Sequence, residues 1–346
     1  MTGQRAESKE PLLDFDQALV VAEHTYSSPD PALLIGNGFS QEFSDEFGYK
    51  ALREKAPLTS LTPGVTKDDL FDHAGTNDFE TVIRTLEHAA DLHDLYDKGG
   101  ALQTKLRGDA ELVKNGLVDA LVAIHPSSAA EIQPARYAPA RSFLSNFSVV
   151  FTLNYDLLLY WTINQQASLS NRAPREDGFR LRGNVLTWIS RGLPHAEVLF
   201  LHGAMHLYAE NSQTHKLSGR GGHIIDQVQE NLDSGRYPLV VTEGSRENKQ
   251  ARIAVNPYLS HCYSRLERLR GSLFIHGASL SNNDQHILDA ISDSGVEALF
   301  VGLFGNESGY RDVKHRAEGI AVERQSRGGR PLHVHFYQSD TAAVWD

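Results

Sequence analysis

Short apolar runs recur along the chain, and a polar or glycine-rich turn follows each of them. Seven runs are rich in valine, isoleucine, leucine and phenylalanine: Ala32–Ile35, Ser148–Leu153, Glu197–Leu201, Pro238–Val241, Ser272–Ile275, Ala298–Leu303 and Leu332–Tyr337. Runs of this length that are apolar on both faces are typical of buried strands in a parallel sheet. Because helical patterns separate several of them, the sequence predicts an α/β protein. We expect a Rossmann-like, mainly parallel sheet with helices on both faces.

The long segment between the first two runs has a helical pattern instead. Apolar residues recur at helical spacing over residues 79–90, and further helices are expected over residues 101–124 and 138–147. The sequence therefore predicts a helical insertion over residues 41–146, after the first strand, that forms a lid or small lobe. No internal repeat or low-complexity tract is evident, and we expect a single domain spanning residues 1–346.

Composition narrows the classes of function. The 346 residues include 33 Lys and Arg against 44 Asp and Glu, and this acidic balance argues against binding to a nucleic-acid backbone. Cys262 is the only cysteine, which excludes an internal disulfide and a zinc site built from several cysteines. The first ten residues lack the apolar core of a signal peptide, and no apolar run reaches the roughly 18–20 residues that span a bilayer. We therefore expect a cytoplasmic protein that does not enter a membrane.

A glycine-containing turn directly follows the first predicted strand. Its sequence is Gly36-Asn37-Gly38-Phe39-Ser40. A glycine pair at a strand end lets the backbone turn sharply and approach a phosphate, to which the next helix offers free N–H donors. Gln41 stands where a dehydrogenase fingerprint has its third glycine, which argues against a hydride-transfer enzyme. A tight turn that binds no ligand is the alternative interpretation.

Polar side chains also interrupt the end of the second predicted strand, in Thr152-Leu153-Asn154-Tyr155-Asp156. Parallel sheets place their ligand sites at the carboxyl ends of the strands, and the spacing of Asn154 and Asp156 can direct both side chains to one side. Asp156 also fits the N-cap of a following helix, which is a purely structural role. Asn154 has no such alternative, because it breaks an otherwise apolar run.

Two later strands end in histidine and glycine. His202 follows the third run and is a candidate general base, since an unperturbed imidazole is largely neutral at pH 7. Gly277 and Ser279 follow the fifth run, where a strand–loop–helix connection capped by Asn282 or Asn283 is an equally good interpretation. The pairs His202 with His206 and His333 with His335 lack a third ligand at a recognisable spacing, so no metal site is expected.

The order of these four motifs resembles the SIR2-like (sirtuin-like) family, and more closely the bacterial SIR2-like proteins grouped as DUF4917. The resemblance covers roughly residues 30–295. It is supported by three further segments: Asp78-Phe79-Glu80, Glu243-Gly244-Ser245 and Asn256-Pro257-Tyr258-Leu259. What it implies is an NAD-binding fold. Ser44-Asp45-Glu46-Phe47 departs from the stretch that follows the glycine turn in deacylating sirtuins, and the single cysteine cannot supply their zinc module.

The resemblance also implies roles for the motif residues. Gly36, Asn37, Gly38, Phe39 and Ser40 would hold the NAD phosphates and flank the nicotinamide ribose, while Gly277 and Ser279 would contact the adenosine side. Asn154 and Asp156 would orient the ribose or the attacking water, and His202 would be the catalytic base. The implied activity is that of an NAD glycohydrolase, which converts NAD as substrate to nicotinamide and ADP-ribose without a metal, as in antiviral (anti-phage) effectors.

Two other functions use the same residues. A non-catalytic module that binds NAD or ADP-ribose would need only the glycine loops and would tolerate loss of His202. A protein deacylase or ADP-ribosyl transferase would in addition need a groove for its acceptor. An NAD hydrolase must be restrained in the cell, and no sensor domain is evident in the sequence. We therefore expect control by self-association or by a regulatory partner protein.

Overall fold

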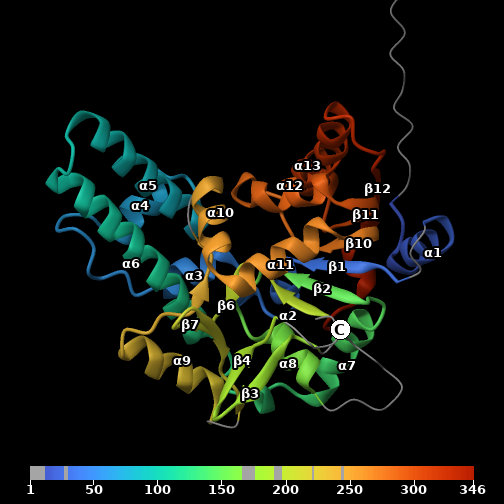
Figure 1. Cartoon of the computed structure of the whole chain (residues 1–346), viewed down its shortest axis with the longest axis horizontal. Helices are drawn as coiled ribbons and strands as arrows, with labels where there is room; N and C mark the ends of the chain where they lie inside the picture. The colour runs from blue at the N-terminus through green and yellow to red at the C-terminus, as the bar shows by residue number, and fades with distance from the viewer. Residues whose placement is uncertain (1–11, 27–29, 166–175, 191–196, 220–221, 243–244) are drawn as a thin grey trace, which may run out of the picture.

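The computed structural model describes residues 12–26, 30–165, 176–190, 197–219, 222–242 and 245–346. At its centre is a six-stranded sheet in the order β12-β11-β10-β1-β2-β5, in which every pair of neighbours is parallel (Figure 1). Its strands in chain order are β1 (Ala32–Ile35), β2 (Val149–Thr152), β5 (Val198–Phe200), β10 (Arg270–His276), β11 (Gly295–Leu303) and β12 (His333–Gln338). The prediction of an α/β fold with a mainly parallel sheet is confirmed.

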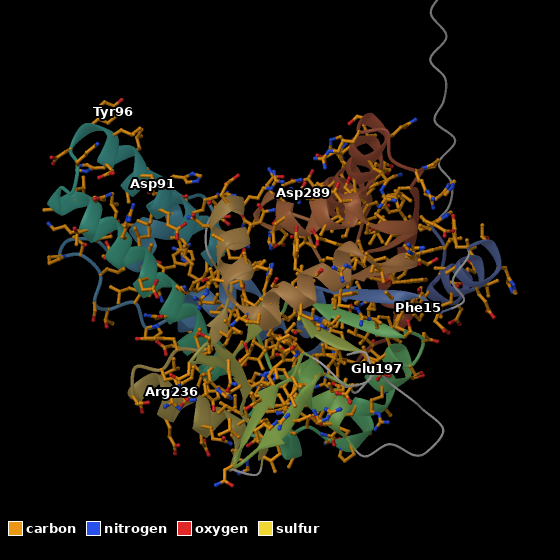
Figure 2. The ribbon with its side chains drawn as sticks, in the orientation of Figure 1. Phe15, Asp91, Tyr96, Glu197, Arg236 and Asp289 are labelled. Atoms are coloured by element: carbon orange, nitrogen blue, oxygen red, sulfur yellow. The ribbon has the colours of Figure 1, made fainter. Side chains whose placement is uncertain are left out.

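Helices cover both faces of this sheet. Phe15 of α1 packs on Phe143 of α7 and Phe274 of β10, with ring centroids 5.2 and 6.0 Å apart, so α1 and α7 share one face (Figure 2). The helices α11, α12 and α13 follow one another along the other face (Figure 1). These five helices are α1 (Phe15–Thr25), α7 (Pro134–Leu144), α11 (Pro257–Glu267), α12 (Gln285–Asp293) and α13 (Glu307–Ser326).

Residues 41–146 are helical, as predicted, and they contain no strand. Beyond α2, which begins in the glycine turn, the segment contains α3, α4, α5, α6 and α7, with α5 and α6 paired in a hairpin that projects from the sheet (Figure 1). The bounds are α2 (Gly38–Phe43), η1 (Asp45–Phe47), α3 (Tyr49–Lys55), α4 (Lys67–His73), α5 (Phe79–Tyr96), α6 (Ala101–Ile124) and η2 (Ala129–Glu131). The last helix, α7, begins at Pro134 rather than at Ala138, because Pro134 takes the first helical position, where its missing N–H costs nothing. It covers the sheet rather than joining the hairpin.

One predicted strand does not belong to the parallel sheet. The run Pro238–Val241 forms β9 (Leu239–Val240), which pairs antiparallel with β6 (Gly203–Ala204). Gly203 permits this pairing, because it has φ +74° and a Cβ built on it would lie 1.9 Å from the Leu239 carbonyl oxygen. The prediction that all seven runs form one parallel sheet is therefore wrong for this run.

A second sheet was not predicted from the sequence. It is antiparallel, in the order β3-β4-β8-β7. Its strands are β3 (Phe179–Arg182), β4 (Val185–Trp188), β7 (Leu207–Glu210) and β8 (Gln213–Lys216). The remaining elements are α8 (Leu158–Asn164), α9 (Ile224–Asp233), α10 (Arg246–Val255), η4 (Asn282–Asp284) and η5 (Ser339–Ala342). Glu243 and Gly244 lie outside the described residues.

Candidate functional site

The register of the parallel sheet brings the predicted motifs to one edge. Ile35 of β1 lies level with Thr152 of β2 and with His276 of β10, and Thr152 lies level with Phe200 of β5. The residues that follow these four positions therefore leave the sheet side by side. A cleft of about 490 Å³ opens there, within the range of roughly 300–1,000 Å³ typical of small-molecule sites.

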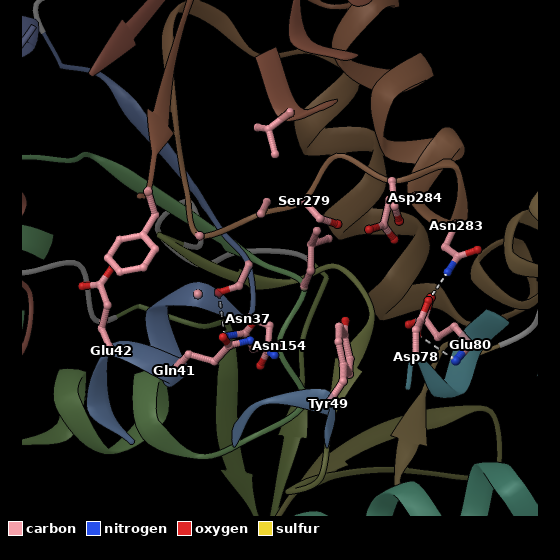
Figure 3. A pocket seen from close by; sticks show the side chains of 18 of the residues that line it. Asn37, Gln41, Glu42, Tyr49, Asp78, Glu80, Asn154, Ser279, Asn283 and Asp284 are labelled. Carbon is pink, nitrogen blue, oxygen red and sulfur yellow. Dashed lines mark hydrogen bonds between the residues drawn. The ribbon is translucent and has the colours of Figure 1, made fainter. Parts of the chain in front are cut away.

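Eight of the ten residues singled out from the sequence line this cleft (Figure 3). They are Gly36, Asn37, Gly38, Asn154, Asp156, His202, Gly277 and Ser279. Phe39 does not line it, since its ring is fully buried and packs on Trp345 at 5.3 Å between centroids. Ser40 is also fully buried, behind the cleft wall, where it contacts Asn154 and Asp156. The structure thus brings together residues from four separate strand ends.

The glycine turn is packed against the loop that follows β10. A Cβ on Gly36 would lie 2.5 Å from the Ala278 Cα, and a Cβ on Gly38 would lie 2.5 Å from the Gly277 Cα. The N–H groups of Gly36 and Gly38 donate to the carbonyls of His276 and Gly277, at 2.9 and 2.8 Å. Glycine is therefore required here for the close approach of two backbone segments. These two N–H groups are already used, so they are not free for a phosphate.

This packing predicts the effect of adding a methyl group to the turn. Gly38→Ala is expected to lower the free energy of unfolding by about 1–3 kcal/mol, because its Cβ would overlap the Gly277 backbone. Gly108→Ala is the matched control, since a Cβ at that position in α6 meets nothing within 4 Å and is expected to stabilise the helix by about 0.5–1 kcal/mol. Urea unfolding of both variants measures the difference. Equal effects would contradict the packing role.

Asn154 and Asp156 are joined through Ser40. The Asn154 amide donates from Nδ2 to the Gly36 carbonyl at 3.1 Å and to Ser40 Oγ at 3.0 Å, and Ser40 Oγ donates to Asp156 Oδ2 at 2.6 Å. The other oxygen of Asp156 accepts from the Leu158 N–H at 2.8 Å, at the start of α8. Burial raises the pKa of Asp156, and the bonds from Ser40 and Leu158 act in the opposite direction. Asp156 therefore bonds to the first N–H of α8, although the N-cap of this helix is Leu157, and both its oxygens are engaged.

His202 lies deep at the end of the cleft. Its side chain is 2% exposed, and its Nε2 is 2.9 Å from Nε2 of His286 on α12. One ring must donate and the other accept, so at least one of the two is neutral. Burial lowers the pKa of His202 well below its usual value, and Lys249 and His286 lower it further. His202 is therefore neutral at pH 7.

Charged residues that the sequence did not single out as site residues surround His202. Lys249 of α10 is fully buried, with Nζ 2.6 Å from Glu80 Oε2 and 3.6 Å from Asp284 Oδ1. The same Asp284 oxygen is 3.8 Å from His202 Nε2. Tyr155 donates to the other oxygen of Glu80 at 2.8 Å. Three helical segments far apart in the chain thus meet in one ionic network.

A hydrogen-bonded chain joins this network to the inserted helices. Asn283 donates from Nδ2 to Asp78 Oδ2 at 2.5 Å and to Thr81 Oγ1 at 3.0 Å, and it accepts from Arg84. Asp78 also caps α5, since its Oδ1 accepts from the Glu80 N–H at 3.0 Å. In Figure 3, Asn283 and Asp284 face Asp78 and Glu80 at one end of the cleft.

Burial and the close approach of several carboxylates raise the pKa values of Asp284 and Asp78 at this end of the cleft. The pKa of Asp284 is raised to about 7, mainly by burial; Lys249 lowers it, while nearby Glu80 and Asp78 raise it. Burial and Glu80 also raise the pKa of Asp78. Burial alone would lower the pKa of Lys249, but Glu80 and Asp284 outweigh it and leave the ammonium charged. Near pH 7 the end therefore holds one fixed cation and a carboxyl group that gains or loses its proton easily.

The charges of the cleft wall have one sign. Six carboxylates line it, while in the part of the chain that the structure describes no lysine or arginine does: Glu42, Asp45, Asp78, Glu80, Asp156 and Asp284. Glu42 and Asn37 lie away from the group of Asp78, Glu80 and Asp284 (Figure 3). A cationic group suits the acidic end, and an anionic group would need hydroxyl or backbone donors elsewhere, as at Ser279.

Two further observations concern metal binding and membrane spanning. Within the described ranges, no three His, Cys, Asp or Glu side chains gather where they could hold a metal ion. Over the same ranges, every helix is too short or too polar to cross a lipid bilayer.

Comparison with known proteins matches the chain to one family. The family model described as "Domain of unknown function (DUF4917)" covers residues 33–345, which include the parallel sheet, the helical insertion and every residue of the cleft. No curated protein shows significant similarity to the chain. The match confirms the expected resemblance to DUF4917, and nothing in the comparison supports the wider SIR2-like resemblance.

Proposed function

Because the chain belongs to the DUF4917 family, whose description assigns no activity, we propose its function from the cleft: it is an NAD glycohydrolase that cleaves the nicotinamide–ribose bond. The single observation that carries this proposal is the acidic end of a cleft at the carboxyl edge of a parallel sheet. The sirtuin-like order of the strand-end motifs agrees with it. In this proposal NAD is the substrate.

The charge pattern supports the orientation of the substrate. The nicotinamide ring of NAD is a cation, and the ribosyl carbon gains positive charge as the bond breaks. Asp78, Glu80 and Asp284 would stabilise both charges from the acidic end. The diphosphate would lie toward the glycine loops, where Ser279 supplies a hydroxyl and where Asp78, Glu80 and Asp284 are farther away.

The proposed reaction needs few groups from the protein. Nicotinamide leaves as a neutral molecule, so the leaving group needs no general acid. Asn154 would orient the ribose through its remaining amide oxygen, since its nitrogen is held by Gly36 and Ser40. Water then adds to the ribosyl carbon and must lose a proton, which is the step that a general base accelerates by roughly 10²–10⁴-fold.

Incubation of the purified full-length chain with NAD tests this proposal directly. We expect release of free nicotinamide and ADP-ribose, measured by chromatography. Asn154→Ala and His202→Ala should each remove most of the activity, because Asn154 would position the ribose and His202 lines its end of the cleft. Circular dichroism melting establishes whether each variant is folded. Full activity in both folded variants would contradict the proposed site.

One observation favours a second function, in which the cleft binds NAD or ADP-ribose as a signal without turnover. His202 is nearly inaccessible, and its Nε2 is occupied by His286, so its ring has limited freedom to take part in a reaction. Isothermal titration with NAD separates the two functions. Binding by wild type and by His202→Ala with equal affinity, without nicotinamide release from either, would replace the hydrolase with a binding module.

A further inference from the structure

We propose that the carboxylate of Asp284 is the catalytic residue that accepts the proton of the attacking water, and that His202 is a positioning residue. This inference rests on the proposed glycohydrolase function. It starts from the local structure around Asp284, which immediately precedes α12 at the helix N-cap position. A side chain there usually bonds to the first N–H groups of the helix, but that of Asp284 forms no such bond.

The carboxylate of Asp284 instead faces the cleft. It is 18% exposed, and its Oδ1 approaches only Lys249 Nζ at 3.6 Å and His202 Nε2 at 3.8 Å. Both distances exceed that of an ordinary hydrogen bond. In the part of the chain that the structure describes, no hydrogen-bond donor lies closer to this carboxylate, so its oxygens can accept a hydrogen bond from a water molecule in the cleft.

The neighbouring carboxylates are already hydrogen-bonded. Glu80 accepts from Tyr155 on one oxygen and binds Lys249 with the other. Asp78 accepts from Asn283 on one oxygen and from the Glu80 N–H on the other.

The same holds farther along the cleft. Both oxygens of Asp156 are held, by Ser40 and by Leu158, and one oxygen of Glu42 is 2.8 Å from His276 Nε2. Asp45 is exposed at the cleft mouth. Among the carboxylates of the acidic end, Asp284 is therefore the one that combines access to the cleft with unused acceptor capacity.

His202 is a poorer acceptor on two grounds. Its Nε2 is already paired with His286, and protonation would place a second cation beside the buried ammonium of Lys249. A pKa near the working pH is the favourable case for a general base, and burial brings the pKa of Asp284 to about 7. The ring of His202 packs beside the Asp284 carboxylate, 3.8 Å from its Oδ1, and so limits the positions that the carboxylate can take.

The step balances with water as the only co-reactant. The bond between the ribosyl carbon and the nicotinamide nitrogen breaks, and its electron pair stays on nicotinamide, which leaves neutral. The water oxygen bonds to the same carbon, and its proton moves to the Asp284 carboxylate and then to solvent. Lys249 keeps Asp284 from rising to a still higher pKa, so part of the carboxylate remains ionised at neutral pH.

Asp284→Asn tests the assignment, with Asp293→Asn as control, since Asp293 is an exposed carboxylate at the end of the same helix. We measure kcat/KM for NAD between pH 5.5 and 8.5. Wild type and Asp293→Asn should gain activity as the pH rises toward about 7, because the base must be ionised. Asp284→Asn should lose roughly 10²–10⁴-fold of the activity at pH 7.5, together with the rising limb of the profile.

Azide provides a readout that a merely structural role would not change. Azide is an anionic nucleophile that needs no deprotonation, so it should restore cleavage of NAD by Asp284→Asn, with nicotinamide and ADP-ribosyl azide as the products. His202→Ala should keep the rising limb and not respond to azide. If Asp284→Asn melts like wild type and retains both its activity and the rise of activity with pH, the assignment of Asp284 is wrong, while the proposed function still stands. Absence of nicotinamide release by wild type overturns the assignment and the proposed function together.

Discussion

Replacing Lys249 with methionine is expected to lower the free energy of unfolding by about 3–5 kcal/mol at pH 8, which is the usual loss when one member of a buried ion pair is removed. Its side chain is fully buried, and its ammonium lies 2.6 Å from Glu80 and 3.6 Å from Asp284. Methionine fills similar space but leaves two carboxylates facing each other without a cation. Urea unfolding followed by circular dichroism measures the loss.

The pH dependence of this loss identifies its electrostatic origin. Without the ammonium, the pKa of Asp284 should rise above about 7, since Lys249 now lowers it. Protonation at pH 5.5 would then remove one of the two unpaired charges, and the loss should be smaller than at pH 8. Lys105→Met, at an exposed position of α6, is the control and should change stability by no more than about 0.5 kcal/mol. A loss of equal size at both pH values would point to packing instead.

The strands of the parallel sheet could be predicted from the sequence where burial requires a continuous run of apolar residues. Six of the seven apolar runs form the parallel sheet, because strands covered on both faces must be apolar throughout. The run that became β9 is equally apolar, but its partner is decided by Gly203, some 35 residues earlier in the chain, which lets the Leu239 backbone approach. In the antiparallel sheet, the apolar residues Leu181 and Val185 are 49% and 37% exposed. Apolar residues therefore do not mark the buried face, and no clear alternation of apolar and polar residues predicts these strands.

The candidate site likewise contains residues that the sequence predicted and residues that it did not. Asn154, His202 and Ser279 could be found because the topology of a parallel sheet places residues after strand ends at one edge. Lys249 could not be identified from the sequence, because Arg246, Glu247 and Asn248 precede it and the segment is typical of a solvated helix. Its burial comes from tertiary packing of α10 beside α5 and η4, which no local pattern encodes. Asp284 belongs to the segment Asn282-Asn283-Asp284, whose sequence indicates only the polar start of a helix.

Asp284→Asn is expected to raise stability at alkaline pH while it removes activity. The folded-state pKa of Asp284 is about 7, raised from 3.8 by burial. A raised pKa means that the folded state favours the protonated form, so the stability that this group contributes is complete below about pH 4 and is lost as the pH rises through 7. A difference of about three pKa units corresponds to at most about 4 kcal/mol, and asparagine, which cannot ionise, avoids this loss.

The measurement is the difference in unfolding free energy between Asp284→Asn and wild type at pH 5 and at pH 8. We expect the variant's advantage to grow by about 2–4 kcal/mol between these values, which is the interval in which folded Asp284 ionises. Acid destabilisation by the buried histidines His125 and His206, whose pKa values burial lowers, affects both proteins and cancels in the difference. A constant difference across this interval would mean that Asp284 is ionised throughout and is not held near neutrality by its surroundings. A growing advantage together with lost turnover would show that the fold tolerates an unfavourable charge at the position where the proposed reaction needs a base.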